Sequence, residues 1–476
     1  MFLRGYILGL YASRTRCFYF PLLLDTPALK FGKQRNEAGA MSTSRPPTPP
    51  QRAPIEEDWR FKELTAPCEW VEAYRPGGYH PVVLGDVFND GQYKIVRKLG
   101  DGSFSTVWLV RDSKNNRYVA LKILVSEISR STNEPQILHD IAKVTKTGVS
   151  NDSRHVTQLL DEFEHQGPNG HHKCLVFEPM GPTVNSMVEE LPQFKPRTFN
   201  MTVRYPPKMA KSILKQSLQG LAFLHGLGIA HGDFQPGNML FPLRKIDSKP
   251  EAELQQNTSG DSWESIPVPV ERIDGKKDEW APPYLYISQP LVRFANYSPG
   301  FKIKLSDMGA AYYFSDPPKE PVTPSGLRPP ELVLSGVVHK SLDVWSFGCL
   351  IFELLTGWPL FLASEDDEHI LNFIERLGPL PDELFEHWKT SSLYFTPERK
   401  LFNCEVGRQP EEGSPLMLEQ QSMEAYFDEA KPDLDAAEAK QVKALIRRVL
   451  QYEPANRPSA SDLLLDPWFC AIDNKG

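Results

Sequence analysis

The sequence predicts an α+β fold of two lobes: a small N-terminal lobe of strands with one main helix, then a larger, mainly helical C-terminal lobe. At 476 residues the chain is long for one domain, so two packed lobes with tails are the natural division. Strand patterns cluster between residues 93 and 124, whereas apolar residues at helical spacing dominate 209–227 and 341–357. With 40% hydrophobic and 24% charged residues, the composition is typical of a globular protein.

Charge and cysteine content narrow the classes of partner and compartment. The formal net charge of -8 provides no general attraction to nucleic acid or to anionic membranes, so we expect neither as a partner. The cysteines are scattered and contain no CxxC pair, which indicates free thiols in a reducing compartment. They are Cys17, Cys68, Cys174, Cys349, Cys404 and Cys470.

The first 40 residues form a separate segment. Basic residues outnumber acidic ones there, and Arg14 and Arg16 interrupt its apolar runs, so no stretch approaches the roughly 20 apolar residues of a membrane span. Two interpretations remain open: a mitochondrial transit peptide, or a misassigned start with Met41 as the true initiator. A proline-rich run follows, and we expect residues 1–69 to be a largely disordered N-terminal extension.

The first folded elements are a turn-rich segment, YRPGGYHPV at 74–82, and a strand expected over Tyr93–Leu99. LGDGSFSTVWLV comes next, with Gly100 and Gly102 before a tip at Phe104. Glycines allow the backbone of a strand–turn–strand unit to lie close over phosphates with its amides pointing at the anion. An ordinary hairpin turn explains the same glycines in isolation.

A lysine on the next strand needs a partner. Val119–Leu124 reads VALKIL, and burying Lys122 among these apolar residues is costly unless its charge is paired. Glu134, in the helical stretch NEPQILHDI, is the expected partner. Pro135 indicates that this helix begins at that point, because proline is accommodated in a first turn.

The segment Ile229–Leu240, IAHGDFQPGNML, predicts a short polar loop between a helix and a buried strand. Asp233 and Asn238 are five residues apart in it, and we expect both to face one cavity. A carboxylate that accepts a hydroxyl proton, beside a neutral oxygen ligand for a hard cation, suits phosphoryl transfer. The structural alternative is a polar turn after the helix.

Two further elements belong to the larger lobe. Residues 209–227 form a helix that leads into this loop, and IKLSDMGAA places Asp307 at the end of an apolar strand with Gly309 freeing the turn. The stretch SLDVWSFGCLIFELLTG at 341–357 is apolar on nearly all sides, which predicts a central buried helix starting at Asp343.

Together these motifs resemble the eukaryotic protein kinases. YRPGGYHPV followed by GDGSFSTVWL is most similar to the SR-protein kinase (SRPK) family, the CMGC-group kinases of arginine–serine repeats, and the match continues through HVTQLLDEF and KCLVFEPMG. The resemblance spans about residues 70–470. It implies the two-lobe protein kinase fold and the cofactors ATP and Mg²⁺.

The resemblance also implies roles for individual residues. Asp233 positions and deprotonates the substrate hydroxyl, Lys122 paired with Glu134 orients the α- and β-phosphates, and Asp307, in the DFG position written here as DMG, holds magnesium with Asn238. The implied nucleotide-binding residues are Leu99, Gly100, Asp101, Gly102, Ser103, Phe104, Ser105, Val107, Ala120, Lys122, Glu134, Phe177 as gatekeeper, and the hinge residues Glu178 and Met180. The implied structural residues are His231, Gly309, Glu331 of the APE position, Asp343 as a brace of the catalytic loop, and Arg457 as the partner of Glu331.

The implied organisation is an N-lobe with hinge at 70–180, a C-lobe at 181–470 and a tail at 471–476. A spacer insert at about 245–295 contains the polar stretch Lys249–Trp280, for which we expect disorder. A CMGC-type insert at about 362–429 has an acidic start. In the family, acidic residues nearby help to bind arginine-rich substrate, but Glu365–Glu368 is equally well explained as a solvated helix cap.

The catalytic loop departs from the family pattern at two positions. Gly232 stands where an arginine is usual, which fits activity that is independent of phosphorylation. Gln235 stands where serine/threonine kinases carry a lysine that contacts the transferring phosphate, so transition-state stabilisation should weaken. Two alternatives follow: a small-molecule kinase with an HGDxxxxN loop, or a pseudokinase scaffold that binds nucleotide.

The sequence therefore predicts a serine/threonine protein kinase whose substrates are arginine/serine-rich proteins such as splicing factors. We expect Asp233, Lys122 and Gln235 to be its catalytic residues. We also expect a monomer in the cytoplasm and nucleus, or in mitochondria if residues 1–40 are a transit peptide.

Overall fold

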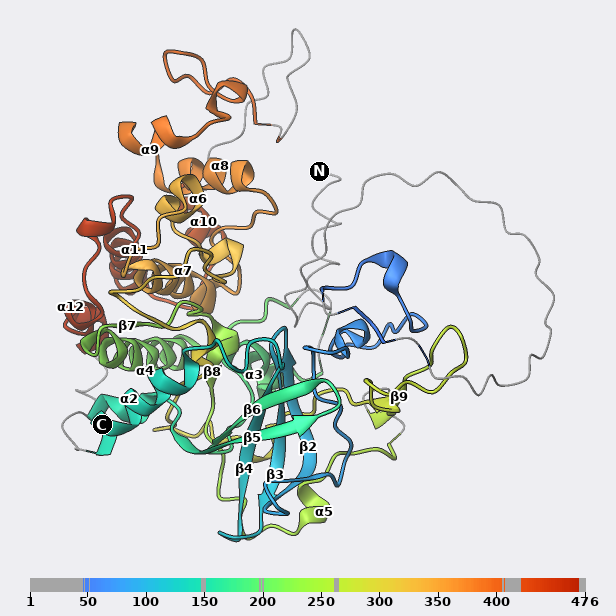
Figure 1. Ribbon diagram of the computed structural model, residues 1–476. Coiled ribbons are helices and arrows are strands. Elements are labelled where there is room, and N and C mark those ends of the chain that lie inside the picture. The colour runs from blue at the N-terminus through green and yellow to red at the C-terminus, as the bar shows by residue number, and fades with distance from the viewer. Residues whose placement is uncertain are drawn as a thin grey trace.

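The computed structural model of the chain describes residues 46, 48–50, 52–146, 151–196, 198, 201–260, 265–404, 406 and 421–470. Both predicted lobes are present in them, one built on a sheet and the other on helices (Figure 1). The segment 1–40 and the tail 471–476 lie outside the described residues. In the described ranges, no helix combines the length and apolar character needed to cross a bilayer.

A six-stranded antiparallel sheet of order β1-β2-β3-β4-β6-β5 forms the small lobe. Its strands are β1 (Val87–Phe88), β2 (Tyr93–Gly102), β3 (Ser105–Asp112), β4 (Arg117–Leu124), β5 (Leu159–Gly167) and β6 (Gly170–Phe177). All residues of β4 after Arg117 are buried, so Lys122 lies where an unpaired charge would be costly. Helix α2 (Glu134–Lys146) starts at Glu134 with Pro135 in its first turn, as predicted.

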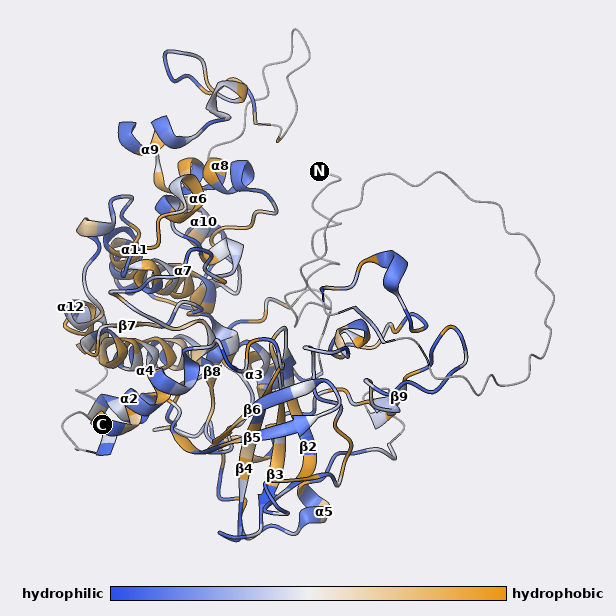
Figure 2. Cartoon of the chain, viewed as in Figure 1, coloured by the Kyte–Doolittle hydropathy of each residue, from blue (hydrophilic) through white to orange (hydrophobic). Residues whose placement is uncertain are grey.

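The large lobe is mainly helical. Its helices are α3 (Val184–Glu190), α4 (Pro207–Gly226), α6 (Pro330–Ser335), α7 (Leu342–Thr356), α8 (Asp366–Leu377), α9 (Asp382–His387), α10 (Met423–Glu429), α11 (Ala436–Val449), α12 (Ala460–Leu464) and α13 (Pro467–Cys470). Helix α7 is buried at every residue except Glu353 and is hydrophobic along most of its length (Figure 2), which confirms the predicted central helix. It packs against α4 and α11.

Two short antiparallel ladders hold together the loops that carry the candidate site. Strand β7 (Ile229–Ala230) pairs with β12 (Tyr312–Tyr313), and β8 (Met239–Leu240) pairs with β11 (Lys304–Leu305). The loop between β7 and β8 therefore lies beside the loop between β11 and β12. This pairing brings together two segments that are about seventy residues apart in the sequence.

The spacer insert is folded where it is described, so the prediction of disorder over Lys249–Trp280 is wrong for that part. It contains α5 (Glu251–Leu254), and β9 (Val268–Pro269) pairs with β10 (Tyr284–Leu285) (Figure 1). Apolar anchors are sparse in this polar segment, but Leu254 and Leu285 are both buried against the small lobe. These few contacts are long-range, so local composition did not reveal them.

The N-terminal extension is also folded over 52–69, which corrects the prediction of disorder there. Phe61 forms an antiparallel bridge with Arg272 of the insert and packs beside Tyr74. The Arg60 guanidinium lies 3.1 Å from Glu72 and 3.4 Å from Asp278 of the insert. The nearly buried Arg60–Asp278 pair and the apolar cluster join the extension to the spacer insert.

The five cysteines in the described residues are all free thiols. The CMGC-type insert contributes α8, α9 and α10, while its residues 405 and 407–420 lie outside the described part.

Three histidines that pack together in the small lobe predict acid sensitivity. The His80 ring lies 4.6 Å from that of His165 and 5.1 Å from that of His172. Burial, with smaller contributions from the two neighbouring rings, lowers the pKa of His80 to about 2, and burial lowers that of His172 to about 4. The unfolded chain therefore takes up these protons near pH 6.5 while the folded chain does not, so stability falls as the pH drops below that value.

Replacing His80 by Phe should remove part of this acid sensitivity. The ring already packs edge-on against Phe88, and no described group bonds its Nδ1, so an apolar ring suits the site. Urea unfolding at pH 7 and pH 5 should show a loss of stability that is smaller by about 2 kcal/mol in His80→Phe than in the wild type. An equal loss in both proteins would contradict the prediction.

Candidate active site

Lys122 links three elements of the candidate site. Its Nζ lies 2.6 Å from Glu134 Oε1 at the start of α2 and 2.7 Å from Asp307 Oδ1 after β11. The predicted pair with Glu134 is present, and the structure adds the contact with Asp307. The lysine and Glu134 are nearly buried, whereas the Asp307 side chain is half exposed.

Electrostatics favour the charged forms of Lys122 and Asp307. Burial alone would lower the pKa of Lys122, but Asp307 and Glu134 more than offset it and raise that pKa above its ordinary value. The nearby Lys122 ammonium holds the pKa of Asp307 below its usual range. Burial raises the pKa of Glu134, although Lys122 opposes that shift. The half-exposed Asp307 therefore remains an anion that can accept a cation.

The β7–β8 loop forms a second cluster around Asp233. Asn238 Nδ2 donates to Asp233 Oδ2 at 2.7 Å and to its carbonyl oxygen at 2.9 Å, so the predicted neighbours are in contact. Gln235 Nε2 donates to Asp233 Oδ1 at 2.7 Å. Two neutral amides thus hold the carboxylate, one on each oxygen. Burial raises the pKa of Asp233, which favours proton acceptance.

Asp343 at the start of α7 braces the backbone of this loop, as the resemblance implied. Its carboxylate accepts hydrogen bonds from the backbone amides of His231 at 2.8 Å and Gly232 at 2.9 Å. His225 adds a contact of 2.9 Å to the same carboxylate. Burial would raise the pKa of Asp343, but these hydrogen bonds outweigh burial and lower it. The His231 ring contacts the carbonyl oxygen of Ser306 at 3.1 Å, next to Asp307.

Gly232 has a structural reason for its departure from the family pattern. Its φ of +78° is in the left-handed region, and a Cβ added there would lie 2.3 Å from the carbonyl oxygen of Ala310. No side chain fits at this position without a backbone shift. Thr323 Oγ1 donates to the Gly232 carbonyl oxygen at 2.6 Å. The sequence reasoning missed Thr323, since a lone threonine in a proline-rich stretch has no local signal.

Asp307, the predicted cation ligand, has a left-handed backbone conformation. Its φ of 61° and ψ of 78° are rare for a residue other than glycine, and such strain concentrates at functional sites. Its side chain accepts a hydrogen bond from the Gly309 amide. The Asn238 amide nitrogen makes both hydrogen bonds to Asp233, so its Oδ1 remains available as an oxygen ligand. A carboxylate and an amide oxygen suit Mg²⁺.

The glycine-rich turn fits a phosphate ligand. Gly102 pairs with Ser105 where β2 turns into β3, and Gly100 pairs with Val107. A Cβ added to Gly100 or Gly102 would meet no described protein atom within 4 Å, so packing does not demand glycine at either position. Open space over the backbone is what a bound triphosphate requires.

The remaining predicted nucleotide-binding residues lie around these elements. Ala120 of β4 faces Phe177 of β6 in register, and Val107 faces Lys122. Glu178 of the hinge pairs with Lys304 at 2.5 Å. Leu99 packs with the cluster that includes Leu254 and Leu291 of the spacer insert. Three of the other residues lie in the glycine-rich turn and one in the hinge: Asp101, Ser103 and Phe104, and Met180.

Glu331 and Arg457 form the predicted buried pair, far apart in the sequence. The Arg457 guanidinium donates to both carboxylate oxygens of Glu331, at 2.6 and 2.7 Å. It also lies over the Trp345 ring of α7, 4.9 Å from the ring centroid. The pair fastens α6 to the segment that follows α11.

Two of the acidic residues at the start of α8 accept hydrogen bonds from other residues of the insert. Asp367 accepts hydrogen bonds from Trp388 Nε1 at 2.7 Å and from the Tyr394 hydroxyl at 2.8 Å. Glu368 accepts one from the Ser364 amide at 2.7 Å. Glu368 thus bonds at the start of α8, as the helix-cap interpretation expects, whereas Asp367 binds side chains that follow α9. Glu365 and Asp366 are exposed.

Comparisons with known proteins agree with this geometry. The family described as protein kinase domain matches residues 93–249 and 294–469. The chain is 31% identical to the serine/threonine-protein kinase SRPK of Physarum polycephalum, over 85% of this chain and 92% of that protein. It is 28% identical to protein kinase dsk1 of Schizosaccharomyces pombe (84% and 85% covered) and 25% identical to human SRSF protein kinase 3 (83% and 89% covered).

These matches support a serine/threonine protein kinase, and none points to a pseudokinase or to a small-molecule kinase. The two-lobe architecture agrees with them. The chain therefore belongs to the protein kinase family and, within it, to the SR-protein kinases.

Proposed function

We propose that this kinase transfers the γ-phosphate of ATP to serine residues in arginine/serine-rich proteins. The observation that carries the proposal is the pair of clusters around Lys122 and Asp233, which supply a paired lysine, a half-exposed carboxylate and a partly buried base. The substrate class rests on the similarity to SRSF protein kinase 3, whose name states that its substrates are SRSF proteins, and on the net charge of -8.

Each residue of the two clusters has a separate role in the proposed reaction. Lys122, held by Glu134, orients the α- and β-phosphates, and the glycine-rich turn covers the triphosphate with its backbone amides. Asp307 and Asn238 would hold Mg²⁺, which supplies positive charge against the phosphate oxygens. Asp233 accepts a hydrogen bond from the substrate serine hydroxyl and takes its proton as that oxygen attacks the γ-phosphorus. The bond from this phosphorus to the bridging oxygen breaks, and ADP leaves. Gln235 and Asn238 keep the Asp233 carboxylate in place.

Gln235→Lys should raise kcat. The Gln235 amide is already 2.7 Å from Asp233, so a lysine at this position would keep the hydrogen bond and add a positive charge near the transferring phosphate. We expect an increase of about three- to tenfold at saturating ATP, since hydrogen bonds to charged groups are stronger than neutral ones. Gln235→Met, which removes the hydrogen bond to Asp233 and adds no charge, should lower kcat. An unchanged or lower kcat in Gln235→Lys would mean that another group already supplies the charge.

The test of the proposed substrate class is radiolabelled phosphate transfer from Mg·ATP. An arginine–serine repeat peptide would be compared with a lysine–serine repeat peptide of equal length and charge and with a generic basic protein, with Asp233→Asn as the blank. Arginine presents a planar fork of donors that lysine lacks, so a specific site should distinguish two peptides of equal charge.

We expect transfer to the arginine peptide to exceed transfer to the lysine peptide. Equal transfer to both would keep the kinase and reject the arginine specificity. Transfer to none of the substrates above the blank would reject the proposed activity.

A further inference from the structure

An acidic residue occupies the middle of the glycine-rich turn, where a negative charge opposes phosphate binding. Asp101 lies between Gly100 and Gly102. Its carboxylate would repel a triphosphate if it faced the same side of the sheet as Lys122. In the structure, the Asp101 carboxylate does not face that side.

The register of the sheet places Asp101 on the face opposite Lys122. Val107 faces Lys122 in the β3–β4 pair and Gly100 in the β2–β3 pair, so these residues share one face. Asp101 faces Thr106, one residue along β3, and successive side chains of a strand point to opposite faces. The Asp101 side chain is also only 8% exposed. Its charge is therefore buried on the outer side of the turn.

A buried lysine pairs with this carboxylate and with a second one, that of Glu69. Lys98 of β2 is fully buried, and its Nζ lies 3.1 Å from Asp101 Oδ1 and in close contact with Glu69 Oε2. A buried lysine is strongly destabilising without a partner, so the ion pairs restrain Lys98 and Asp101 together. Tyr79 contributes a hydrogen bond from its hydroxyl to the Gly102 carbonyl oxygen at 2.7 Å.

The spacer insert also restrains Asp101 and Lys98, through hydrogen bonds. Ser288 Oγ donates to Asp101 Oδ1 at 2.9 Å. The Gln289 amide donates to the Lys98 carbonyl oxygen at 2.9 Å, and Gln256 Oε1 accepts from the Lys98 amide at 3.0 Å. Glu69, Gln256 and Ser288 all lie outside the residues that match the protein kinase domain. Segments beyond the matched domain thus hold the outer side of its glycine-rich turn.

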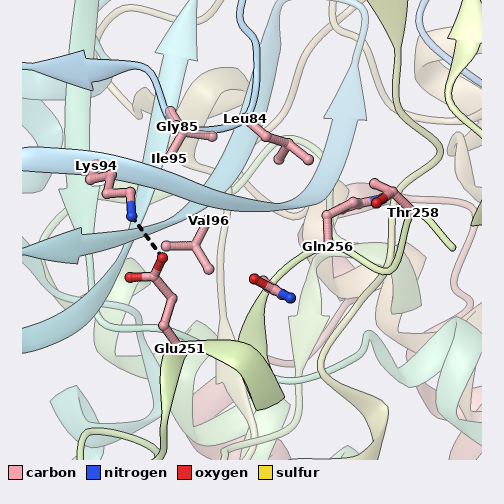
Figure 3. Close-up of a pocket in the computed structure, with 9 residues that line it drawn as sticks. Leu84, Gly85, Lys94, Ile95, Val96, Glu251, Gln256 and Thr258 are labelled. Atoms are coloured by element: carbon pink, nitrogen blue, oxygen red, sulfur yellow. Dashed lines mark hydrogen bonds and ion pairs between the residues drawn. The ribbon is translucent and has the colours of Figure 1, made fainter.

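A pocket of about 250 Å³ marks the outer end of this contact between the insert and β2 (Figure 3). Val96 and Gln256 line it, and Lys94 pairs with Glu251 at 2.7 Å across it. The side chains of both partners in this ion pair are partly exposed. It therefore offers a matched control, because it joins the same two segments without contacting the turn.

We propose that Ser288 and Lys98 are positioning residues for nucleotide binding, which hold the Asp101 carboxylate on the outer side of the glycine-rich turn. The inference rests on the proposed binding of ATP under this turn. A turn that is ordered before binding costs less entropy when the nucleotide arrives. An Asp101 carboxylate that is held on the outer face and paired with Lys98 repels the phosphates less than one that is free to turn toward them. The spacer insert is thereby part of the machinery that sets nucleotide affinity.

The test uses the full chain and four proteins besides the wild type: Ser288→Ala, Asp101→Ala, the double variant and the control Glu251→Gln. The Kd of a fluorescent ATP analogue, the KM for ATP and kcat would be measured for each. We expect Ser288→Ala to raise Kd and KM by about three- to tenfold, which corresponds to the free energy of one net hydrogen bond. The kcat of this variant should stay within about twofold of wild type. In the Asp101→Ala background the same change should have no further effect, because the group that it restrains is absent. Glu251→Gln should leave Kd and KM unchanged.

An unchanged Kd in Ser288→Ala, an equal rise in Glu251→Gln, or full additivity in the double variant would each overturn the proposal. The binding measurement separates it from the proposed function. If the wild type binds the analogue but transfers no phosphate, the proposed activity falls, and the Kd comparison still decides the role of Ser288.

Discussion

Asp233→Asn is expected to lower kcat by about 100- to 10,000-fold, the usual loss when a general base is removed. The Oδ1 of an asparagine can still accept from one of the two neighbouring amides, but the side chain cannot take up the serine proton. The Asp343 carboxylate, which holds the backbone amides of His231 and Gly232, is unchanged, so the loop should retain its conformation in the variant. Single-turnover phosphate transfer at saturating Mg·ATP measures the effect on the chemical step.

Two controls make this result interpretable. Glu383→Gln makes a comparable change from acid to amide at an exposed position of α9, and it should leave kcat unchanged. Cooperative urea unfolding of Asp233→Asn should resemble that of the wild type. Residual activity within about tenfold of wild type would show that Asp233 is not the base.

Arg457→Met is expected to cost about 3–5 kcal/mol of stability, the penalty for leaving a buried charge without its partner. Glu331 is buried, and both of its carboxylate oxygens accept from the Arg457 guanidinium. Methionine keeps an apolar side chain of similar length beside Trp345 but removes the guanidinium that lies over its ring. The free energy of unfolding in urea at pH 7 measures the loss.

The exposed pair of Arg399 and Asp382 provides the comparison for Arg457. Arg399→Met should change the free energy of unfolding by about 0–1 kcal/mol, because solvent screens exposed pairs. The double variant Arg457→Met, Glu331→Gln should recover part of the stability, since no carboxylate is then left buried and unpaired. Similar losses for Arg457→Met and Arg399→Met would contradict the buried-pair interpretation.

Most of the candidate site could be predicted because its residues lie in short motifs with strong local structure. Lys122 was expected to need a partner from its apolar strand alone, and Glu134 stands at the first turn of the next helix. Asp233 and Asn238 share one short loop, so their contact follows from proximity in sequence. The resemblance to the SR-protein kinases extended the prediction to distant pairs such as Glu331 with Arg457.

The spacer insert could not be predicted in the same way. Polar composition suggested disorder over Lys249–Trp280, yet this segment is held by a few buried anchors and by hydrogen bonds to a strand some 150 residues earlier. Asp367 and Glu368 similarly appeared free to meet a substrate until their partners within the insert were visible.

The sequence by itself determined the fold class, the family and the chemical groups of the catalytic site, since each follows from local periodicity or from a motif of a few residues. Only the tertiary structure decided what those groups contact. Gly232 lacks a side chain because the Ala310 carbonyl oxygen fills the space, and Asp101 of the glycine-rich turn contacts Lys98 and Ser288. Such contacts join residues as many as 187 positions apart, and local sequence carries no signal for a hydrogen bond whose partner is brought close only by folding.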